Sequence, residues 1–197
     1  MSKSLTIFGF IGVIILFLGI FFFGSYNNLI RQNEQVKQAW SQVENVYQRR
    51  LDLIPNLVET VKGYAEHERS TFQAVIEARA KASQMTVSPA VVNDPEAFSK
   101  FQSAQSSLSF ALGRLLVVME RYPELKANQN FLALQAELEG TENRIAVERR
   151  RFNDVAQDFN TKMRVFPNVL IANVMGFKEK AYFKSEEAAS KAPKVKF

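Results

Sequence analysis

Residues 5–23 read LTIFGFIGVIILFLGIFFF, a run of 19 residues without a charge. As a helix this run would be about 28 Å long, close to the roughly 30 Å hydrocarbon core of a bilayer. A cleavable signal peptide would have a shorter apolar run with small residues before its cleavage site, but Phe22 and Phe23 occupy those positions here. The run therefore predicts an uncleaved transmembrane helix, with residues 1–25 forming the tail and anchor. A buried core helix and a signal peptide are the alternatives.

Membrane lipids are the first partner that the sequence predicts, in a single-pass arrangement whose orientation depends on charge and length. Lys3 and the α-amino group precede the span, and Arg31 and Lys37 follow it, so the positive-inside rule barely discriminates. Exporting a short tail moves far fewer polar groups across the bilayer than exporting the remaining chain. We therefore expect an N-terminus outside and a cytoplasmic body.

Gly9, Gly12 and Gly19 share one face of the predicted span. Small residues let two transmembrane helices approach closely, although the strict small-xxx-small spacing is missing here. These glycines are the candidate packing face of a homo-oligomer. The alternative is that they have no such role, since glycine is common in transmembrane helices.

The composition excludes most catalytic and metal chemistry. The chain has no cysteine and one histidine, His67, which excludes disulfides, thiolate nucleophiles, iron–sulfur clusters and multi-histidine metal sites. A zincin motif would need a second histidine at position 71, which is Thr71. The glycines are scattered and form no phosphate-binding loop. We predict no cofactor, no metal and no enzymatic activity.

The net charge of +5 comes largely from residues 178–197, which contain six lysines and three glutamates. Such a basic tail is expected to be solvated, with binding to lipid headgroups or to a partner as the alternative. The run Arg149-Arg150-Arg151 is expected on a solvated helix face, because adjacent helical residues point in different directions. No basic motif interleaved with aromatic residues indicates nucleic-acid binding.

Beyond the anchor, apolar residues recur at alternating spacings of three and four, the pattern of helices that pack on one another. The pattern holds over residues 29–47, 54–79, 98–122 and 131–159, and no segment alternates convincingly as a strand. The fold class is therefore all-α. Polar residues interrupt these seams and are expected to reach solvent; if buried, they would need partners. They are Glu68, Arg79, Gln105, Thr141 and Glu148.

Local signals set the helix boundaries. Asp94 followed by Pro95 is typical of an N-cap and first helical position, and Pro123 is expected to end that helix. Asn128 or Asn130 is expected to begin the last helix, which Pro167 bounds. Together these signals predict an up-and-down antiparallel four-helix bundle over residues 26–177.

Pro55 leaves two geometries open between the first two segments. Asp52 would cap a new helix with Pro55 in its first turn, which gives a tight hairpin. Alternatively, one helix continues to Met85 with a kink near Leu51, whose carbonyl loses its partner. We favour the hairpin, because four antiparallel segments close a bundle.

Several motifs resemble those of the LemA family. They include Ala39-Trp40, Arg49-Arg50-x-Asp52-Leu53-Ile54-Pro55-Asn56-Leu57-Val58, Tyr122-Pro123-Glu124-Leu125-Lys126, Thr141-Glu142-Asn143-Arg144-Ile145-Ala146 and Phe166-Pro167. The resemblance covers about residues 26–183, with Phe152 where the family commonly has tyrosine. The family-motif residues singled out are Trp40, Arg50, Asp52, Pro55, Asn56, Glu142, Asn143 and Arg144.

The resemblance implies a bacterial inner-membrane protein with one N-terminal span and a helical body. Gene neighbourhood in the family suggests membrane proteases or envelope-stress proteins as associates. Two functions fit the anchor, the long helices and the lack of reactive groups. The favoured one is a non-catalytic membrane-anchored scaffold or structural protein that self-associates and contacts protein partners. The alternative is a sensor or adaptor for a membrane protease or an envelope-stress signalling system.

Overall fold

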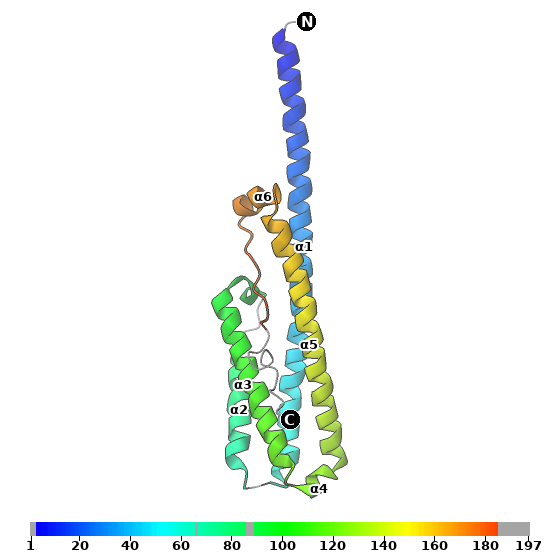
Figure 1. Ribbon diagram of the computed structural model, residues 1–197, viewed down its shortest axis with the longest axis vertical. Coiled ribbons are helices and arrows are strands. Elements are labelled where there is room, and N and C mark those ends of the chain that lie inside the picture. Colours follow the sequence, from blue (N-terminus) through cyan, green and yellow to red (C-terminus); the bar gives the residue numbers. More distant parts are fainter. Residues whose placement is uncertain (1–2, 66, 86–88, 185–197) are drawn as a thin grey trace, which may run out of the picture.

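The computed structural model describes residues 3–65, 67–85 and 89–184, and this part of the chain is helical with no strand. Six α-helices and one 3-10 helix follow one another along the chain (Figure 1). They are α1 (Lys3–Lys62), α2 (Arg69–Gln84), η1 (Val91–Asn93), α3 (Pro95–Met119), α4 (Pro123–Lys126), α5 (Gln129–Arg164) and α6 (Asn168–Met175). The all-α prediction is therefore confirmed for the described residues.

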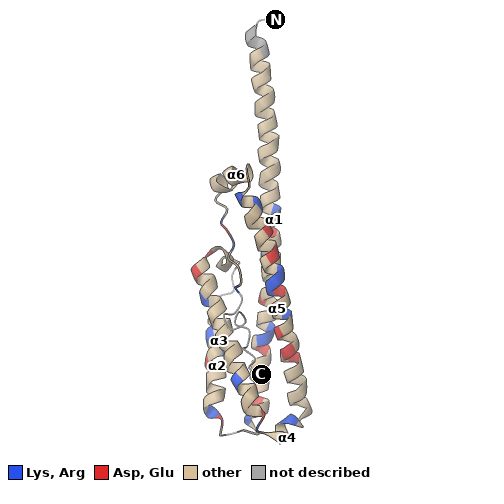
Figure 2. Cartoon of the chain, viewed as in Figure 1, with Lys and Arg blue, Asp and Glu red and all other residues tan. Residues whose placement is uncertain are grey.

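Helix α1 has 60 residues, and its N-terminal part projects beyond all other elements (Figure 1). An 18-residue window in this helix has a mean hydropathy of 2.8, and none of that window is buried within the chain. Figure 2 shows that the charged residues belong to the body and that the projecting part carries none from Ile7 onward. By length and composition, the helix is able to cross a membrane.

The predicted hairpin at Asp52 and Pro55 is wrong. Helix α1 continues through Pro55 and ends at Lys62, so it also stops well before Met85. Proline has no N–H, and the carbonyl four residues earlier belongs to Leu51. Nε of Arg79, in α2, donates a hydrogen bond to this oxygen at 2.9 Å. A distant side chain thus replaces the missing backbone donor and lets the helix continue.

The helices of the body lie in two close pairs. Helix α1 packs along α5, and α2 packs along α3. At the end remote from the projecting helix, one core cluster joins residues 51–61 of α1 and Ala65, which follows it, to α2, α3, Leu125 of α4, and Phe131 and Leu138 of α5. A second cluster, nearer to the projecting part, joins residues 29–47 of α1 to η1, the start of α3, the rest of α5, α6 and Phe183.

The predicted helix starts are confirmed where the structure shows a cap. The carboxylate of Asp94 accepts hydrogen bonds from the N–H groups of Glu96 at 2.9 Å and Ala97 at 3.2 Å, with Pro95 in the first turn. Oδ1 of Asn128 accepts from the N–H of Phe131 at 3.1 Å, which begins α5. These caps are local interactions between a side chain and the turn that follows it, which is why the sequence predicts them.

The sequence predicts that the polar residues on the seams reach solvent, but not all of them do. Gln105 and Thr141 are buried, so this expectation is wrong for both. Oγ1 of Thr141 donates to the carbonyl of Glu137 at 2.8 Å, within its own helix. Gln105 contacts a side chain of α1, which makes it part of the candidate site.

Candidate binding groove between α3 and α5

Trp40 is the centre of an aromatic cluster that the segment after α6 completes. Its ring lies 5.5 Å from that of Phe101 in α3 and 5.3 Å from that of Phe152 in α5. A further side comes from Phe183, whose ring stacks on the indole at 6.0 Å. Phe183 belongs to residues 177–184, which follow α6 without forming a helix or strand. This C-terminal segment is therefore part of the core rather than an appendage.

Two asparagines of α5 hold the main chain of the C-terminal segment. The amide of Asn160 donates to the carbonyl of Lys180 at 2.9 Å and accepts from its N–H at 2.8 Å. Asn153 pairs in the same way with the carbonyl and N–H of Phe183, both at 2.9 Å. Asparagines seven residues apart on a helix are separated by about 10.5 Å, and three residues of extended chain span about 10 Å. The spacing of the two asparagines therefore matches the spacing of Lys180 and Phe183, so α5 binds the extended segment in register.

The opposite side of the segment is held by η1 and α3. The N–H of Ala181 donates to the carbonyl of Val92 at 2.9 Å. At the end of the described segment, the carbonyl of Lys184 accepts from Gln102 of α3 and from Arg149 of α5, both at 2.9 Å. Most of these hydrogen bonds go to the main chain, so they do not select particular side chains in the segment.

Lys180 is buried beside this array. Its Nζ donates to Oδ1 of Asn93 at 2.6 Å and lies 4.9 Å from the centre of the Phe159 ring. Burial lowers the pKa of Lys180 to about 8, and the positive charge of Lys37 acts in the same direction. The ammonium group is thus held in place at a cost in solvation.

Arg50 joins three helices just beyond the aromatic cluster. Its side chain is 1% exposed. From α1, Nη1 donates to Oγ of Ser109 in α3 at 2.8 Å and to a carboxylate oxygen of Glu142 in α5 at 2.9 Å. Nη2 donates to the side-chain oxygen of Gln105, and the guanidinium lies 5.0 Å from the centre of the Tyr47 ring. One buried cation therefore fixes the positions of α3 and α5 relative to α1.

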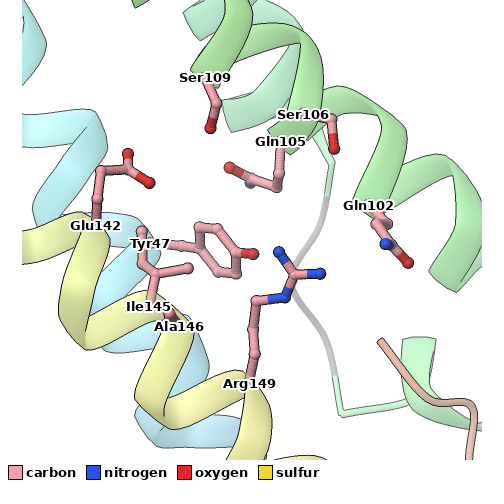
Figure 3. Close-up of a pocket in the computed structure, with 9 residues that line it drawn as sticks. All are labelled: Tyr47, Gln102, Gln105, Ser106, Ser109, Glu142, Ile145, Ala146 and Arg149. Atoms are coloured by element: carbon pink, nitrogen blue, oxygen red, sulfur yellow. The ribbon is translucent and has the colours of Figure 1, made fainter. Parts of the chain in front are cut away.

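The groove occupied by the C-terminal segment continues past Lys184 as a pocket of about 110 Å³ between α3 and α5 (Figure 3). Tyr47 of α1 lies between the two walls, which expose amide, hydroxyl, carboxylate and guanidinium groups. The side-chain Nε2 of Gln105, in this lining, has no hydrogen-bond partner among the described residues. A second hollow of about 470 Å³ adjoins the pocket and shares Ser109 and Glu142 with it. The pocket lining is Tyr47, Gln102, Gln105, Ser106, Ser109, Glu142, Ile145, Ala146 and Arg149.

Residues 39–197 match the sequence model of the LemA family. The chain belongs to the LemA family. Protein LemA of Metamycoplasma hominis is 28% identical over 183 residues, covering 91% of this chain and 80% of its own length. Magnetosome protein MamQ 2 of Paramagnetospirillum magneticum and magnetosome protein MamQ of Magnetospirillum gryphiswaldense are each 26% identical over 179 residues. These matches cover 83% of this chain and 66% of each MamQ protein. The resemblance expected from the motifs is thus confirmed.

The structure brings some of the LemA motif residues together and separates others. Arg50 and Glu142 pair beside the pocket, Trp40 lies in the aromatic cluster against Phe183, and Asn143 borders the larger hollow. Pro55 lies within α1, and Arg144 is exposed on α5.

The remaining motif residues lie on exposed surface of α1. Asp52 accepts a hydrogen bond from Gln48 at 2.8 Å and does not begin a helix. Asn56 accepts from Thr60 through its backbone carbonyl at 2.8 Å.

Gly9, Gly12 and Gly19 lie in the projecting part of α1, where an added Cβ would meet no atom within 4 Å.

Several residues of the groove were not predicted as site residues. Asn153, Asn160 and Gln102 hold the C-terminal segment, and the signals for them in the sequence are the family pattern Phe152-Asn153 and the seven-residue spacing of the two asparagines. Arg149, expected on a solvated face, instead binds the carbonyl of Lys184 and lies 4.8 Å from the centre of the Phe183 ring. Residues 178–184 pack on the body although the sequence places them in a tail, and residues 185–197 lie outside the described residues.

The described residues contain no group of three or more histidine, cysteine, aspartate or glutamate side chains placed to hold a metal ion. The chemistry that the groove does offer is hydrogen bonding, with donors and acceptors on both walls. Such a lining is suited to binding a peptide main chain.

Proposed function

We propose that this LemA family protein is a non-catalytic scaffold anchored in the bacterial inner membrane, and that it holds partner proteins by an extended segment bound between α3 and α5. One observation carries the proposal. The groove already holds residues 177–184 through paired amide contacts to the main chain of Lys180 and Phe183. The same groove then continues beyond Lys184.

Recognition through the main chain explains how one groove would serve several partners. The binding of residues 177–184 shows how such recognition works, because Asn153 and Asn160 contact main-chain groups of this segment and no particular side chain. The adjoining pocket offers Gln105 and Ser106 on α3 and Glu142 and Arg149 on α5, which supply further donors and acceptors.

The anchor contributes by restricting where binding takes place. A body fixed to a membrane meets partners in the same membrane at a raised effective concentration, so a weak groove still assembles a complex. We place the body on the cytoplasmic side, with the N-terminus outside. The MamQ relatives are named as magnetosome proteins and not for a reaction, which also supports a structural role.

Self-association of the scaffold would use Gly9, Gly12 and Gly19. Because side chains added at these positions meet nothing within the described chain, substitution there tests contacts between chains only. We expect Gly12→Leu with Gly19→Leu to reduce crosslinked dimer in native membranes several-fold, whereas Ile15→Leu leaves it unchanged. An unchanged dimer yield in the glycine variant would refute this packing face.

The groove is tested by photo-crosslinking in intact cells from a photoreactive residue at Ser106, which lines the pocket. Ser107 is the matched control, because it is the neighbouring serine of α3, is exposed and lies outside the lining. We expect one reproducible partner from position 106 and not from position 107, with the crosslink mapped by mass spectrometry to a non-helical stretch of that partner. Crosslinks only to residues 185–197 or to a second copy would refute partner binding in the groove.

The second candidate function is an adaptor that delivers substrates to a membrane protease or an envelope-stress signalling enzyme. A groove that grips an extended main chain favours it, because proteases also act on extended segments. The two functions differ in the fate of the partner crosslinked at position 106. Its half-life stays the same in cells with Ser106→Trp, whose indole fills the pocket, if the protein is a scaffold, and lengthens if it is an adaptor.

A further inference from the structure

Helix α6 carries apolar side chains that no described part of the protein covers. Leu170 and Val174 are four residues apart within the helix and share one face, and Phe166 lies in the turn just before the helix. They are 78%, 59% and 78% exposed. The other face holds Ile171 and Ala172, which are buried in the core cluster around Trp40. The exposed face therefore points away from the body.

The position of α6 along α1 shows what faces it. The ring of Phe177, just after α6, lies 6.3 Å from that of Tyr26, and Leu29 belongs to the same core cluster as Ile171. Leu29 is six residues beyond Phe23, the end of the apolar run, which corresponds to about 9 Å along the helix. Figure 1 shows α6 beside α1 at the end of the body from which the apolar part projects.

A bilayer crossed by α1 has a polar interfacial layer of about 5–8 Å outside its hydrocarbon core. The 9 Å offset therefore brings α6 to the edge of this layer. Amphipathic helices at such positions lie in the interface and bury their apolar face about 5–10 Å deep. Lys162 and Lys178 flank α6 in the sequence and are exposed, which suits phospholipid headgroups, whereas Arg164 is paired with Glu179.

We propose that α6 and the preceding Phe166 form a second membrane contact, which inserts Phe166, Leu170 and Val174 into the leaflet next to the body. The partner is the interfacial region of the phospholipid bilayer itself. With two contact points, the body is held at a fixed tilt instead of swinging on α1. The inference depends on the span and not on the groove, and it holds for either orientation of the protein in the membrane.

The test places an environment-sensitive fluorophore on single cysteines, which this cysteine-free chain allows without background labelling. The full-length protein is reconstituted into phospholipid nanodiscs that contain nitroxide-labelled lipids, with no other protein present. Val174→Cys is the test position. Val117→Cys in α3 is its matched control, because this valine is similarly exposed, at 71%, and lies near the far end of the body. Ile15→Cys reports on the span.

We expect a blue-shifted emission and at least threefold stronger quenching at position 174 than at position 117, with the strongest quenching from nitroxides near the headgroups. Deep quenching at position 15 together with equal, weak quenching at positions 174 and 117 would overturn the proposal while leaving the span intact. That result, combined with protein crosslinks from position 174 in cells, would assign the apolar face to a protein partner. Absence of quenching at position 15 would overturn both the span and the membrane contact of α6.

Discussion

Replacing Arg79 with methionine removes the donor that serves the carbonyl of Leu51, while the apolar stem of the side chain is largely retained. The bond is 2.9 Å long, partly buried and made by a charged donor. Such bonds contribute about 1.5–3 kcal/mol net. We therefore expect Arg79→Met to lower the free energy of unfolding of the body by about 2 kcal/mol. Lys81→Met, two residues further on the exposed surface of α2, is the control and should stay within about 0.5 kcal/mol of the wild type.

A second substitution identifies the cause. Pro55→Ala restores a backbone N–H that can itself bond to the carbonyl of Leu51, and proline costs about 3 kcal/mol relative to alanine inside a helix. Because Arg79 already offsets part of this cost, we expect Pro55→Ala to stabilise the body by about 1 kcal/mol. In this background Arg79→Met should cost only about 0.5 kcal/mol, which gives a coupling of about 1.5 kcal/mol between the two positions.

The measurement is unfolding of the full chain in mild detergent, followed by far-ultraviolet circular dichroism, for the wild type, both single variants and the double variant. Detergent retains the helix of the span, so the transition reports on the body. An equal cost of Arg79→Met with proline and with alanine at position 55 would refute the reasoning. The arginine would then stabilise the protein through packing and not through the carbonyl freed by the proline.

Three further predictions concern the groove. Arg50→Met should lower the free energy of unfolding of the body by about 3 kcal/mol, since it removes hydrogen bonds of a charged group inside the protein. Arg49→Met is the control, because this side chain is 51% exposed, and it should cost under about 1 kcal/mol. Equal losses for the two variants in unfolding experiments would contradict this prediction. Asn160→Ala should speed hydrogen exchange of the Lys180 amide about 10-fold to 30-fold, while the exposed Asn173→Ala should leave it unchanged. Lys180 has a pKa of about 8 in the folded chain and about 10.4 in the unfolded chain, so the unfolded chain binds more protons between these pH values. The free energy of unfolding should therefore rise with pH from about 8 to 10. Lys180→Met should remove this rise, which is measured as the difference between the unfolding midpoints of the wild type and the variant at each pH.

The parts of the fold that local chemistry determines could be predicted from the sequence. Asp94 and Asn128 cap helices through contacts with the next turn, so a short stretch contains all the information. The path at Pro55 could not be predicted in the same way. Its compensation comes from Arg79, 28 residues from the carbonyl that it binds, and no local pattern relates them. A helix that should break by local rules continues because a tertiary contact replaces one hydrogen bond.

The candidate site shows the same division. Trp40, Arg50 and Glu142 stand out as family-motif residues, and the structure places them around one groove. Asn153 stands out only as part of the family pattern Phe152-Asn153, and Asn160 does not, because their partner is the main chain of residues 177–184 and main-chain groups are the same for nearly every residue. Gln105 was expected in solvent because a polar seam residue is often exposed. It is buried because Arg50 is buried beside it.

The continuous helix α1 also sets the distance between the apolar run and the pocket, and thereby which partner segments can reach the pocket. Tyr47 is 24 residues beyond Phe23 on the same helix, so the pocket lies about 36 Å from the hydrocarbon core. An extended chain covers about 3.4 Å per residue, so a segment of a membrane-embedded partner would need about ten residues to span the distance from the hydrocarbon core to the pocket. The C-terminal segment follows such a path, because it begins beside Tyr26 and ends between Gln102 and Arg149. The chain's own residues 177–184 fill the groove on the side of the apolar run, so a partner segment would enter the pocket beyond Lys184, and α1 keeps its distance from the apolar run constant because it continues through Pro55.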